Sequence, residues 1–160
     1  MDRLWAPWRL PYMKKASKNK EKGCLFCRKY KSKKDSTNYV IERRKHSFAL
    51  LNIYPYNNGH CMVVPKRHVK DLDQLQDCEL LEMMQLVVAM KKRLKKKLNP
   101  HGFNIGINCG LVAGAGIENH IHLHIVPRWN GDTNCMPVFA DLKVIPQSLD
   151  ALYKVLTKNR

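Results

Sequence analysis

The segment that decides both the fold and the chemistry of this chain is His120-Ile121-His122-Leu123-His124-Ile125-Val126. Histidines alternate with aliphatic residues, a two-residue period that is typical of a β-strand with two different faces. All three imidazoles would share one face, with neighbours about 6.6 Å apart at the backbone. Because burying polar rings is costly unless something polar meets them, this segment predicts a functional face.

Two kinds of chemistry suit a row of three imidazoles. Neighbouring histidines on one strand can converge on a single metal ion. Alternatively, one imidazole can act as a nucleophile while its neighbours fix its tautomer and charge. This segment by itself leaves both open.

A second group of candidate metal ligands comes earlier in the chain. Cys24 and Cys27 have C-x-x-C spacing, and His60 and His68 lie at either end of an expected strand. Two thiolates with two imidazoles make a closed tetrahedral zinc site of structural type. Residues 1–8 contain no apolar stretch that could serve as a secretion signal, so we expect reduced thiols and a cytoplasmic location.

The rest of the pattern predicts an α+β fold. Short apolar runs bounded by turn residues predict strands over residues 39–42, 47–53, 60–64, 103–109 and 120–126, and a short C-terminal helix over 149–156. Asp71 to Leu98 predicts one long helix with an apolar stripe that includes Met84, acidic residues near its start and lysines near its end. Without regular βαβ alternation, we expect a mainly antiparallel sheet of about five strands.

The length of 160 residues suits one compact unit. Within it we interpret residues 1–38 as a basic N-terminal extension that carries the C-x-x-C zinc half-site, and residues 39–160 as the catalytic domain. No apolar run approaches the ~20 residues of a membrane-spanning helix, which argues against a membrane protein.

Positive charge is concentrated in two places. The chain has 29 Lys and Arg against 13 Asp and Glu, a formal net charge of +16. Residues 1–34 hold 12 bases and 2 acids, and residues 91–97 hold 6 bases, which leaves 11 of each sign elsewhere. Nucleic acid, a membrane surface or a small polyanion could exploit this distribution. A solvated helix end and a lysine-rich arm explain it more simply, so nucleic-acid binding through the arm is not favoured.

The two histidine-bearing segments resemble the histidine triad (HIT) family. His120 to Val126 matches the family's alternating signature, and Asn58 to His68 looks like its upstream Gly-His…Val-Pro-Lys-x-His segment. The resemblance covers about residues 24–130. A bacterial branch that includes diadenosine tetraphosphate phosphorylases is similar in three further segments: Leu4 to Arg9, Pro127 to Trp129 and Gly131 to Asn134. The resemblance implies a nucleotide-binding α+β fold, usually a homodimer, acting on phosphoanhydrides or phosphoramidates of nucleoside 5′-phosphates.

The resemblance also implies roles for individual residues. His122 would be the nucleophile, with His124 and His60 beside the phosphate oxygens. Members with the cysteine pair hold zinc through a set that corresponds to Cys24, Cys27, His68 and His120. For the nucleotide, it implies Asn52 on the ribose hydroxyls, Leu50 and Ile53 as walls of the base pocket, and Asn108 near the phosphate.

One segment departs from the family pattern. Many relatives carry Ser, Thr or Gln just before the triad, whereas this chain has Gly116-Ile117-Glu118-Asn119. Backbone amides at Gly114 and Gly116 could instead contact phosphate oxygen, since glycine lets N–H groups approach an anion closely. The same glycines could equally form no more than a tight loop.

Three functions therefore follow from the sequence. The first is a nucleotidyl hydrolase or transferase that cleaves dinucleoside polyphosphates, or related nucleotide conjugates, through a nucleotidyl-histidine intermediate. The second is a non-catalytic module that binds nucleotides or nucleic acid. The third is a catalytic metal held by the three histidines.

Overall fold

The computed structural model describes residues 23–132 and 144–158. The basic arm before Gly23, with its possible contact to nucleic acid, lies outside the described residues. So do Cys135 and the end of the segment that resembles the bacterial branch.

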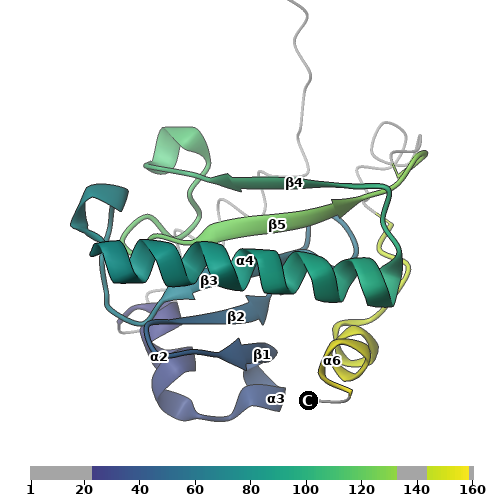
Figure 1. The fold of residues 1–160 in the computed structure, drawn as a ribbon, viewed down its shortest axis with the longest axis horizontal. Coiled ribbons are helices and arrows are strands. Elements are labelled where there is room, and N and C mark those ends of the chain that lie inside the picture. Colours follow the sequence, from purple (N-terminus) through teal and green to yellow (C-terminus); the bar gives the residue numbers. More distant parts are fainter. Residues whose placement is uncertain (1–22, 133–143, 159–160) are drawn as a thin grey trace, which may run out of the picture.

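Within residues 23–132, a five-stranded sheet forms the centre of the fold (Figure 1). Its strands follow the order β1-β2-β3-β5-β4, and all neighbouring pairs are antiparallel. Their bounds are β1 Val40–Arg43, β2 Ser47–Leu51, β3 Cys61–Pro65, β4 Gly102–Ile107 and β5 Leu123–Arg128. The predicted α+β class with a sheet of about five strands is confirmed.

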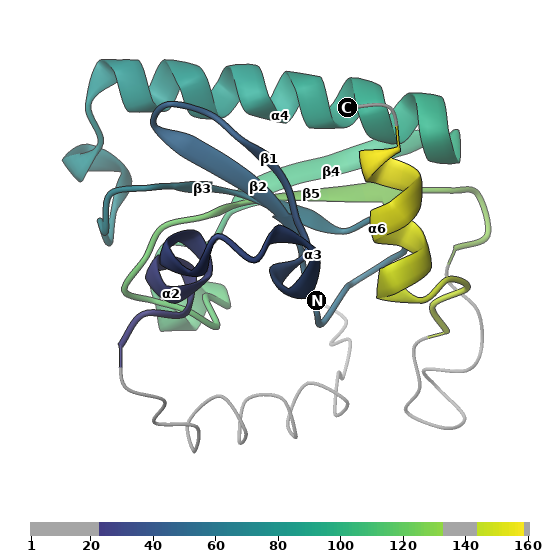
Figure 2. The ribbon, with the colours of Figure 1, turned by 90° about the horizontal axis from the view of Figure 1, so that it is seen from below.

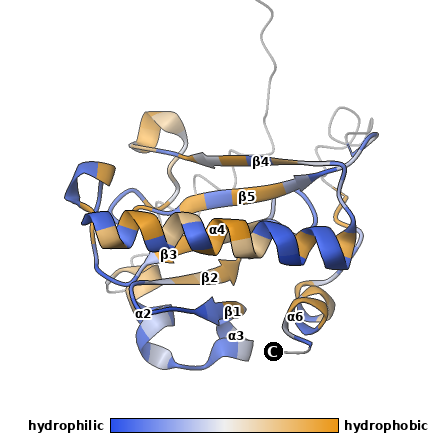
Figure 3. Cartoon of the chain, in the orientation of Figure 1, coloured by the Kyte–Doolittle hydropathy of each residue, from blue (hydrophilic) through white to orange (hydrophobic). Residues whose placement is uncertain are grey.

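One face of the sheet is covered by the long helix α4 (Asp77–Leu98), which Figure 1 shows in front of the sheet, running in nearly the same direction as the strands. Its polar and apolar residues alternate along the visible surface (Figure 3). The buried apolar stripe consists of Met83, Leu86, Val87, Met90 and Leu94. The prediction that Met84 belongs to this stripe is wrong, because its side chain is half exposed.

The predicted start of this helix at Asp71 is also wrong. Residues Leu72–Gln74 form a separate 3-10 turn, η1, and the carboxylate of Asp71 accepts a hydrogen bond from the amide of Leu72 at 2.7 Å. A second capping interaction, from the amide of Gln76 to the Glu79 carboxylate at 2.9 Å, begins α4. Two separate N-terminal caps therefore start two separate helical segments, η1 and α4.

The opposite face of the sheet carries α2 (Leu25–Ser32), α3 (Asp35–Asn38) and the turn η2 (Leu111–Ala113) (Figure 2). Phe26 of α2 is completely buried there among side chains of β1, β2 and β3: Val40, Phe48, Leu50, Met62 and Val64. Because Phe26 lies between Cys24 and Cys27, burying its ring fixes the C-x-x-C turn against the sheet.

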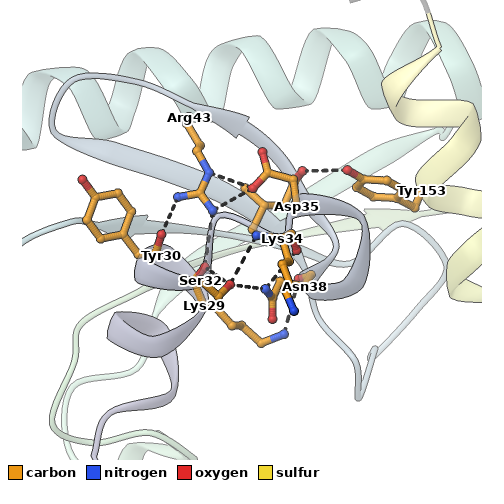
Figure 4. A network of polar contacts seen from close by, with 9 residues as sticks. Lys29, Tyr30, Ser32, Lys34, Asp35, Asn38, Arg43 and Tyr153 are labelled. Carbon is orange, nitrogen blue, oxygen red and sulfur yellow. Dashed lines mark hydrogen bonds and ion pairs between the residues drawn. The ribbon is translucent and has the colours of Figure 1, made fainter.

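Arg43 in β1 joins α2 and α3 to the sheet (Figure 4). Its guanidinium donates to the carboxylate of Asp35 at 2.8 Å, to the carbonyl of Tyr30 at 2.9 Å and to the carbonyl of Lys29 at 3.3 Å. These carbonyls belong to the last turn of α2, where carbonyl groups lack helical partners. One cation thus holds the end of α2 in place, and with it the cysteine pair at the other end.

The predicted C-terminal helix is α6 (Leu149–Thr157), which packs against α4 and β1. Its Tyr153 hydroxyl donates to the carbonyl of Val40 at 3.2 Å. Among the described residues, no helix has the length and apolarity needed to cross a membrane.

Candidate active site and metal centre

Only one of the three alternating histidines lies in a strand. β5 begins at Leu123, so His124 belongs to it while His120 and His122 precede it. The ladder with β3 ends at the pair Val63–Leu123, and the chain before it bonds elsewhere, with the amide of Ile121 donating to the carbonyl of Val69 at 2.8 Å. The prediction of a strand from residue 120 is therefore wrong.

The predicted division of faces is nevertheless observed. Ile121, Leu123 and Ile125 are buried in the core beneath α4. The imidazole rings of His122 and His124 lie 4.8 Å apart between centroids, on the face that carries α2. Extended backbone alternates its side chains even where no ladder hydrogen bonds form.

The imidazole of His120 lies beside the thiols of Cys24 and Cys27. Its Nδ1 lies 3.2 Å from Sγ of Cys24, 3.7 Å from Sγ of Cys27 and 3.3 Å from Nδ1 of His68. Its Nε2 lies 2.9 Å from the carbonyl of Pro65, which can only accept, so the ring proton is on Nε2. The lone pair on Nδ1 is then directed at the two sulfurs.

These four side chains fit a divalent metal. The candidate ligand atoms of Cys24, Cys27, His68 and His120 all lie within 4.8 Å of one another. Tetrahedral zinc with thiolate and imidazole ligands requires ligand–ligand separations of about 3.4–3.8 Å, close to those observed. Burial and the neighbouring Cys24 raise the pKa of the Cys27 thiol, and a cation bound here would reverse that effect.

His122 has one ring nitrogen bonded to the backbone and one that holds a lone pair. Its Nδ1 lies 2.9 Å from the carbonyl of His120, so this nitrogen carries the proton and donates it. The Nε2 atom therefore holds a lone pair. The ring of Phe26 packs against the same imidazole with 5.0 Å between centroids, and also lies 5.4 Å from the ring of His120.

A relay of hydrogen bonds fixes the other pair of histidines. The amide of Tyr56 donates to Nδ1 of His60 at 3.0 Å, which leaves the proton of His60 on Nε2. That nitrogen lies 2.9 Å from Nδ1 of His124 and donates to it, so His124 carries its own proton on Nε2. Nε2 of His124 is buried and has no hydrogen-bond partner among the described residues. A buried N–H donor without a partner suits an anionic oxygen of a ligand.

Burial keeps these rings neutral at neutral pH. Loss of hydration is the largest cause in each case, and it lowers the pKa of His60 to about 3 and the pKa of both His120 and His124 to about 4. The pKa of His122 is lowered for the same reason. A neutral imidazole is the form that can attack an electrophile or bind a metal.

The tight approach of the turn before His60 requires glycine. Gly59 has a φ of +77°, and a Cβ there would lie 2.8 Å from Cδ1 of Leu98 and 3.0 Å from Cγ of Pro127. A larger residue would be strained at this φ and would press on these two side chains, so glycine helps to hold the turn that carries the amide of Tyr56.

The nucleotide-binding candidates are only partly brought together. Asn52 lies beside His60, with Nδ2 3.4 Å from Nδ1, and the side chain of Ile53 is exposed nearby in the sequence. Leu50 differs from the expectation of a pocket wall, because it is completely buried in the cluster around Phe26. The side chain of Leu50 is therefore not accessible to a ligand in this structure.

The glycine segment next to the triad forms a closed loop. The amide of Gly114 donates to the carbonyl of Leu111 at 2.9 Å, and Nδ2 of Asn108 donates to the carbonyl of Gly114 at 3.3 Å. The Gly114 amide is therefore used inside the loop, which favours the tight-loop interpretation at that position. Gly116 is exposed.

Two residues of the site were not predicted from the sequence. In the sequence, Phe26 has the pattern of an ordinary core residue between two cysteines, and Tyr56 belongs to a predicted turn. The x-x of a C-x-x-C motif could have suggested Phe26, since an aromatic ring there must pack beside the ligands. For Tyr56, only the fold brings its ring to 4.6 Å from His60.

Comparisons with known proteins show the family to which this chain belongs. A family model of the HIT domain matches residues 33–131. The chain belongs to the HIT family. It is 38% identical over 154 residues to the AP-4-A phosphorylase of Mycobacterium tuberculosis (strain CDC 1551 / Oshkosh), covering 93% of this chain and 79% of that protein. It is an enzyme of this family.

Two further similarities concern the chemistry and the metal. The asymmetrical bis(5'-nucleosyl)-tetraphosphatase of Schizosaccharomyces pombe is 33% identical over 125 residues, covering 78% of this chain and 68% of that protein. A Zn-bound histidine triad family protein from Mycobacterium smegmatis superposes with a TM-score of 0.69 at 27% identity, covering 84% of this chain and 91% of that one.

Acid is expected to destabilise the fold through His60. Its pKa is about 3 in the folded chain against an ordinary value of 6.5, so between these values the unfolded state binds more protons and the free energy of unfolding falls as the pH falls. The contribution is about 1.4 kcal/mol per pH unit. The free energy of unfolding is measured by urea titration at about pH 6, 5.5 and 5. Its decrease with falling pH should be less steep for His60→Gln than for the unmodified chain. Equal slopes would contradict a neutral, buried His60.

Proposed function

We propose that this protein is a nucleotidyl hydrolase or phosphorylase that cleaves a phosphoanhydride of dinucleoside polyphosphates through a covalent intermediate on His122. The observation that carries the proposal is the pairing of two neighbouring rings of opposite function. His122 offers a lone pair on Nε2, because its Nδ1 donates to the His120 carbonyl. His124, whose ring centroid is 4.8 Å away, offers a buried N–H.

The reaction has two displacements at one phosphorus. Nε2 of His122 attacks the phosphorus next to the nucleoside, the bond to the bridging oxygen breaks, and the remaining phosphate chain leaves with that electron pair. Water or inorganic phosphate then attacks the same phosphorus and loses a proton to solvent. The P–Nε2 bond breaks, its electron pair returns to Nε2, and His122 is neutral again. Splitting one difficult displacement into two is the benefit of a covalent intermediate.

The neighbouring groups stabilise the charge that develops on the phosphoryl oxygens. The N–H of His124 is held by His60, and His60 by the amide of Tyr56. Donors that are already oriented need little reorganisation as the transition state forms. Asn52, Ile53, Asn108 and the loop at Gly116 complete the proposed nucleotide site.

The names of two similar proteins indicate which substrate and which acceptor to test first. One similar protein bears the name of a phosphorylase of AP-4-A, and another that of an asymmetrical bis(5'-nucleosyl)-tetraphosphatase. The higher identity and coverage belong to the phosphorylase. Diadenosine tetraphosphate with phosphate as acceptor is therefore the first reaction to assay, with water as the alternative acceptor.

Two other functions are disfavoured by the orientation of the rings. A catalytic metal on all three histidines would need their lone pairs to converge, whereas His120 directs Nδ1 at the cysteines and His122 directs its Nδ1 proton at a carbonyl. A non-catalytic binding module would have no need for an available imidazole lone pair beside an oriented donor.

Removing the imidazole of residue 122 should abolish turnover. His122→Ala is expected to lower kcat on diadenosine tetraphosphate by at least about 1,000-fold, since a covalent nucleophile has no substitute. The control is His101→Ala, an exposed histidine that is none of the proposed site residues and whose ring accepts from the amide of Asn130; it should retain full activity. Product formation is followed by chromatography with and without phosphate. Full activity of His122→Ala would refute the covalent mechanism.

The metal proposed for the cluster of Cys24, Cys27, His68 and His120 is structural zinc. All four positions are taken by protein atoms, as in closed structural sites. When bound, zinc would supply a cross-link between α2 and the segment before β5, without reacting itself. Cysteine ligands of this kind suit a reducing compartment such as the cytoplasm.

Loss of one ligand should release the metal. Cys24→Ser is expected to lose the one zinc ion per chain measured by elemental analysis, and to lower the melting temperature by about 5 °C or more. Cys78→Ser is the matched control, because Cys78 is exposed and lies outside the cluster. Unchanged zinc content in Cys24→Ser would show that the ligand set is wrong.

We also infer that the protein forms a homodimer through α4 and β4. Leu81, Met84 and Val88 are 61%, 50% and 48% exposed and follow one another at helical spacing on one side of α4. Lys91 continues this row, and its Nζ lies 5.9 Å from the ring centroid of Phe103 in β4, so the row faces β4. Within the described residues, β4 is an edge strand of the sheet, and its Ile105 is 43% exposed. A second copy would cover this apolar surface.

A charge in this surface should separate the copies. Met84→Glu is expected to halve the mass measured by light scattering, because burying an unpaired carboxylate in an interface is unfavourable. Val144→Glu changes an equally exposed apolar residue outside the row and should leave the mass unchanged. A monomeric unmodified chain would contradict the inference directly.

A further inference from the structure

The turn after β5 carries a buried carboxylate that has no part in the proposed reaction. Asp132 lies in one of the segments that resemble the bacterial branch, and its side chain is only 8% exposed. Its carboxylate accepts from the guanidinium of Arg128 at 2.6 and 2.9 Å and from the amide of Trp129 at 3.1 Å. A buried charge needs several such donors. A further donor comes from a distant part of the chain.

That donor is Asn57, in the turn that precedes His60. Its Nδ2 donates to the Asp132 carboxylate at 2.7 Å and to the carbonyl of Pro127 at 3.1 Å. The Asn57 carbonyl accepts from the amide of His60 at 3.2 Å, and its Oδ1 accepts from the amide of Asn58 at 3.1 Å. Asn57 is buried. It therefore ties the turn before His60 to the end of β5.

The residue before Asn57 supplies the amide that orients His60. The amide of Tyr56 donates to Nδ1 of His60 at 3.0 Å, whereas Nδ2 of Asn52, which also faces this nitrogen, lies at 3.4 Å. Because the Tyr56 amide is one residue from Asn57, its direction depends on where the Asn57 side chain is held. The bonds from Asn57 to Asp132 and Pro127 hold it.

The direction of this one amide decides what both imidazoles can do. With its proton on Nε2, His60 donates to Nδ1 of His124, and His124 keeps an N–H on its own Nε2. If His60 instead carried its proton on Nδ1, its Nε2 would accept from His124, and Nε2 of His124 would hold a lone pair. A lone pair repels an anionic oxygen. Only the first arrangement can therefore stabilise charge on a phosphoryl group.

We propose that Asn57 is a positioning residue for His60 and His124, and that Asp132 and Arg128 hold its side chain in place. The proposal rests on the proposed function, in which His124 donates to a phosphoryl oxygen. The guanidinium of Arg128 also donates to Oδ1 of Asn104 in β4 at 2.8 Å. The network thus anchors the turn before His60 to two neighbouring strands of the sheet.

The first test removes the side-chain amide of residue 57 and observes the imidazole rings. In long-range nitrogen–proton spectra of 15N-labelled Asn57→Ala, the ring nitrogens of His60 and His124 should move toward the values of a mixture of tautomers. The ring nitrogens of His122 should keep their values, because the partner of its Nδ1 is the carbonyl of His120. A loss of structure throughout the site would change all three rings.

The kinetic test separates positioning from binding. On diadenosine tetraphosphate, Asn57→Ala should lower kcat about 10-fold, which is part of the 100- to 1,000-fold that loss of one oriented donor costs. KM should not change, because the donor acts on charge that develops in the transition state.

The matched control is Asn58→Ala, which removes the same kind of side chain from the next position. Nδ2 of Asn58 lies 3.4 Å from Oε1 of Gln147. This variant should leave kcat and all three rings unchanged. Asp132→Asn keeps the size of the side chain and removes its charge, so it should produce the changes of Asn57→Ala to a smaller extent.

The outcomes separate this proposal from the proposed function. Unchanged ring nitrogens of His60 and His124 in folded Asn57→Ala would overturn the positioning role, and so would an equal change at His122. If Asn57→Ala does not fold, the spectra of Asp132→Asn decide in the same way. Failure of the unmodified enzyme to cleave diadenosine tetraphosphate would instead refute the proposed function, while the spectra, which need no substrate, would still decide the role of Asn57.

Discussion

The hydrogen bond from Nδ1 of His122 to the carbonyl of His120 is the interaction on which the site depends. A neutral imidazole can protonate either nitrogen, and only one tautomer presents a lone pair on Nε2. The carbonyl selects that tautomer at a distance of 2.9 Å. Because the acceptor belongs to the backbone of His120, the extended conformation of residues 120–124 itself selects the tautomer of the proposed nucleophile.

The same segment links the proposed metal centre to the proposed nucleophile, His122. His120 contributes its ring to the cysteine cluster and its carbonyl to His122. Phe26, held between the two cysteines, contacts both rings. A zinc ion that fixes α2 against the segment before β5 would therefore also restrain the imidazole of His122 from two sides. In this arrangement, the same residues would stabilise the fold and orient the proposed nucleophile.

Much of this site follows from local sequence. Alternation predicts the two faces of residues 120–126, and the spacing of Cys24 and Cys27, with the family resemblance, predicts the four residues of the metal cluster. Long-range pairing decides the rest. The strand begins only at Leu123 because the ladder with β3 ends there and Ile121 bonds to Val69 instead. Leu50 is buried because Phe26 covers it, and α4 begins late because η1 has its own cap. No local sequence pattern predicts these long-range contacts.

The tautomer of His122 can be measured directly. Long-range nitrogen–proton correlation spectra of the 15N-labelled protein at neutral pH distinguish a protonated ring nitrogen from one with a lone pair. The account predicts that His122 is protonated on Nδ1 and bare on Nε2, while His124 shows the opposite arrangement. A His122 ring protonated on Nε2, or on both nitrogens, would contradict it.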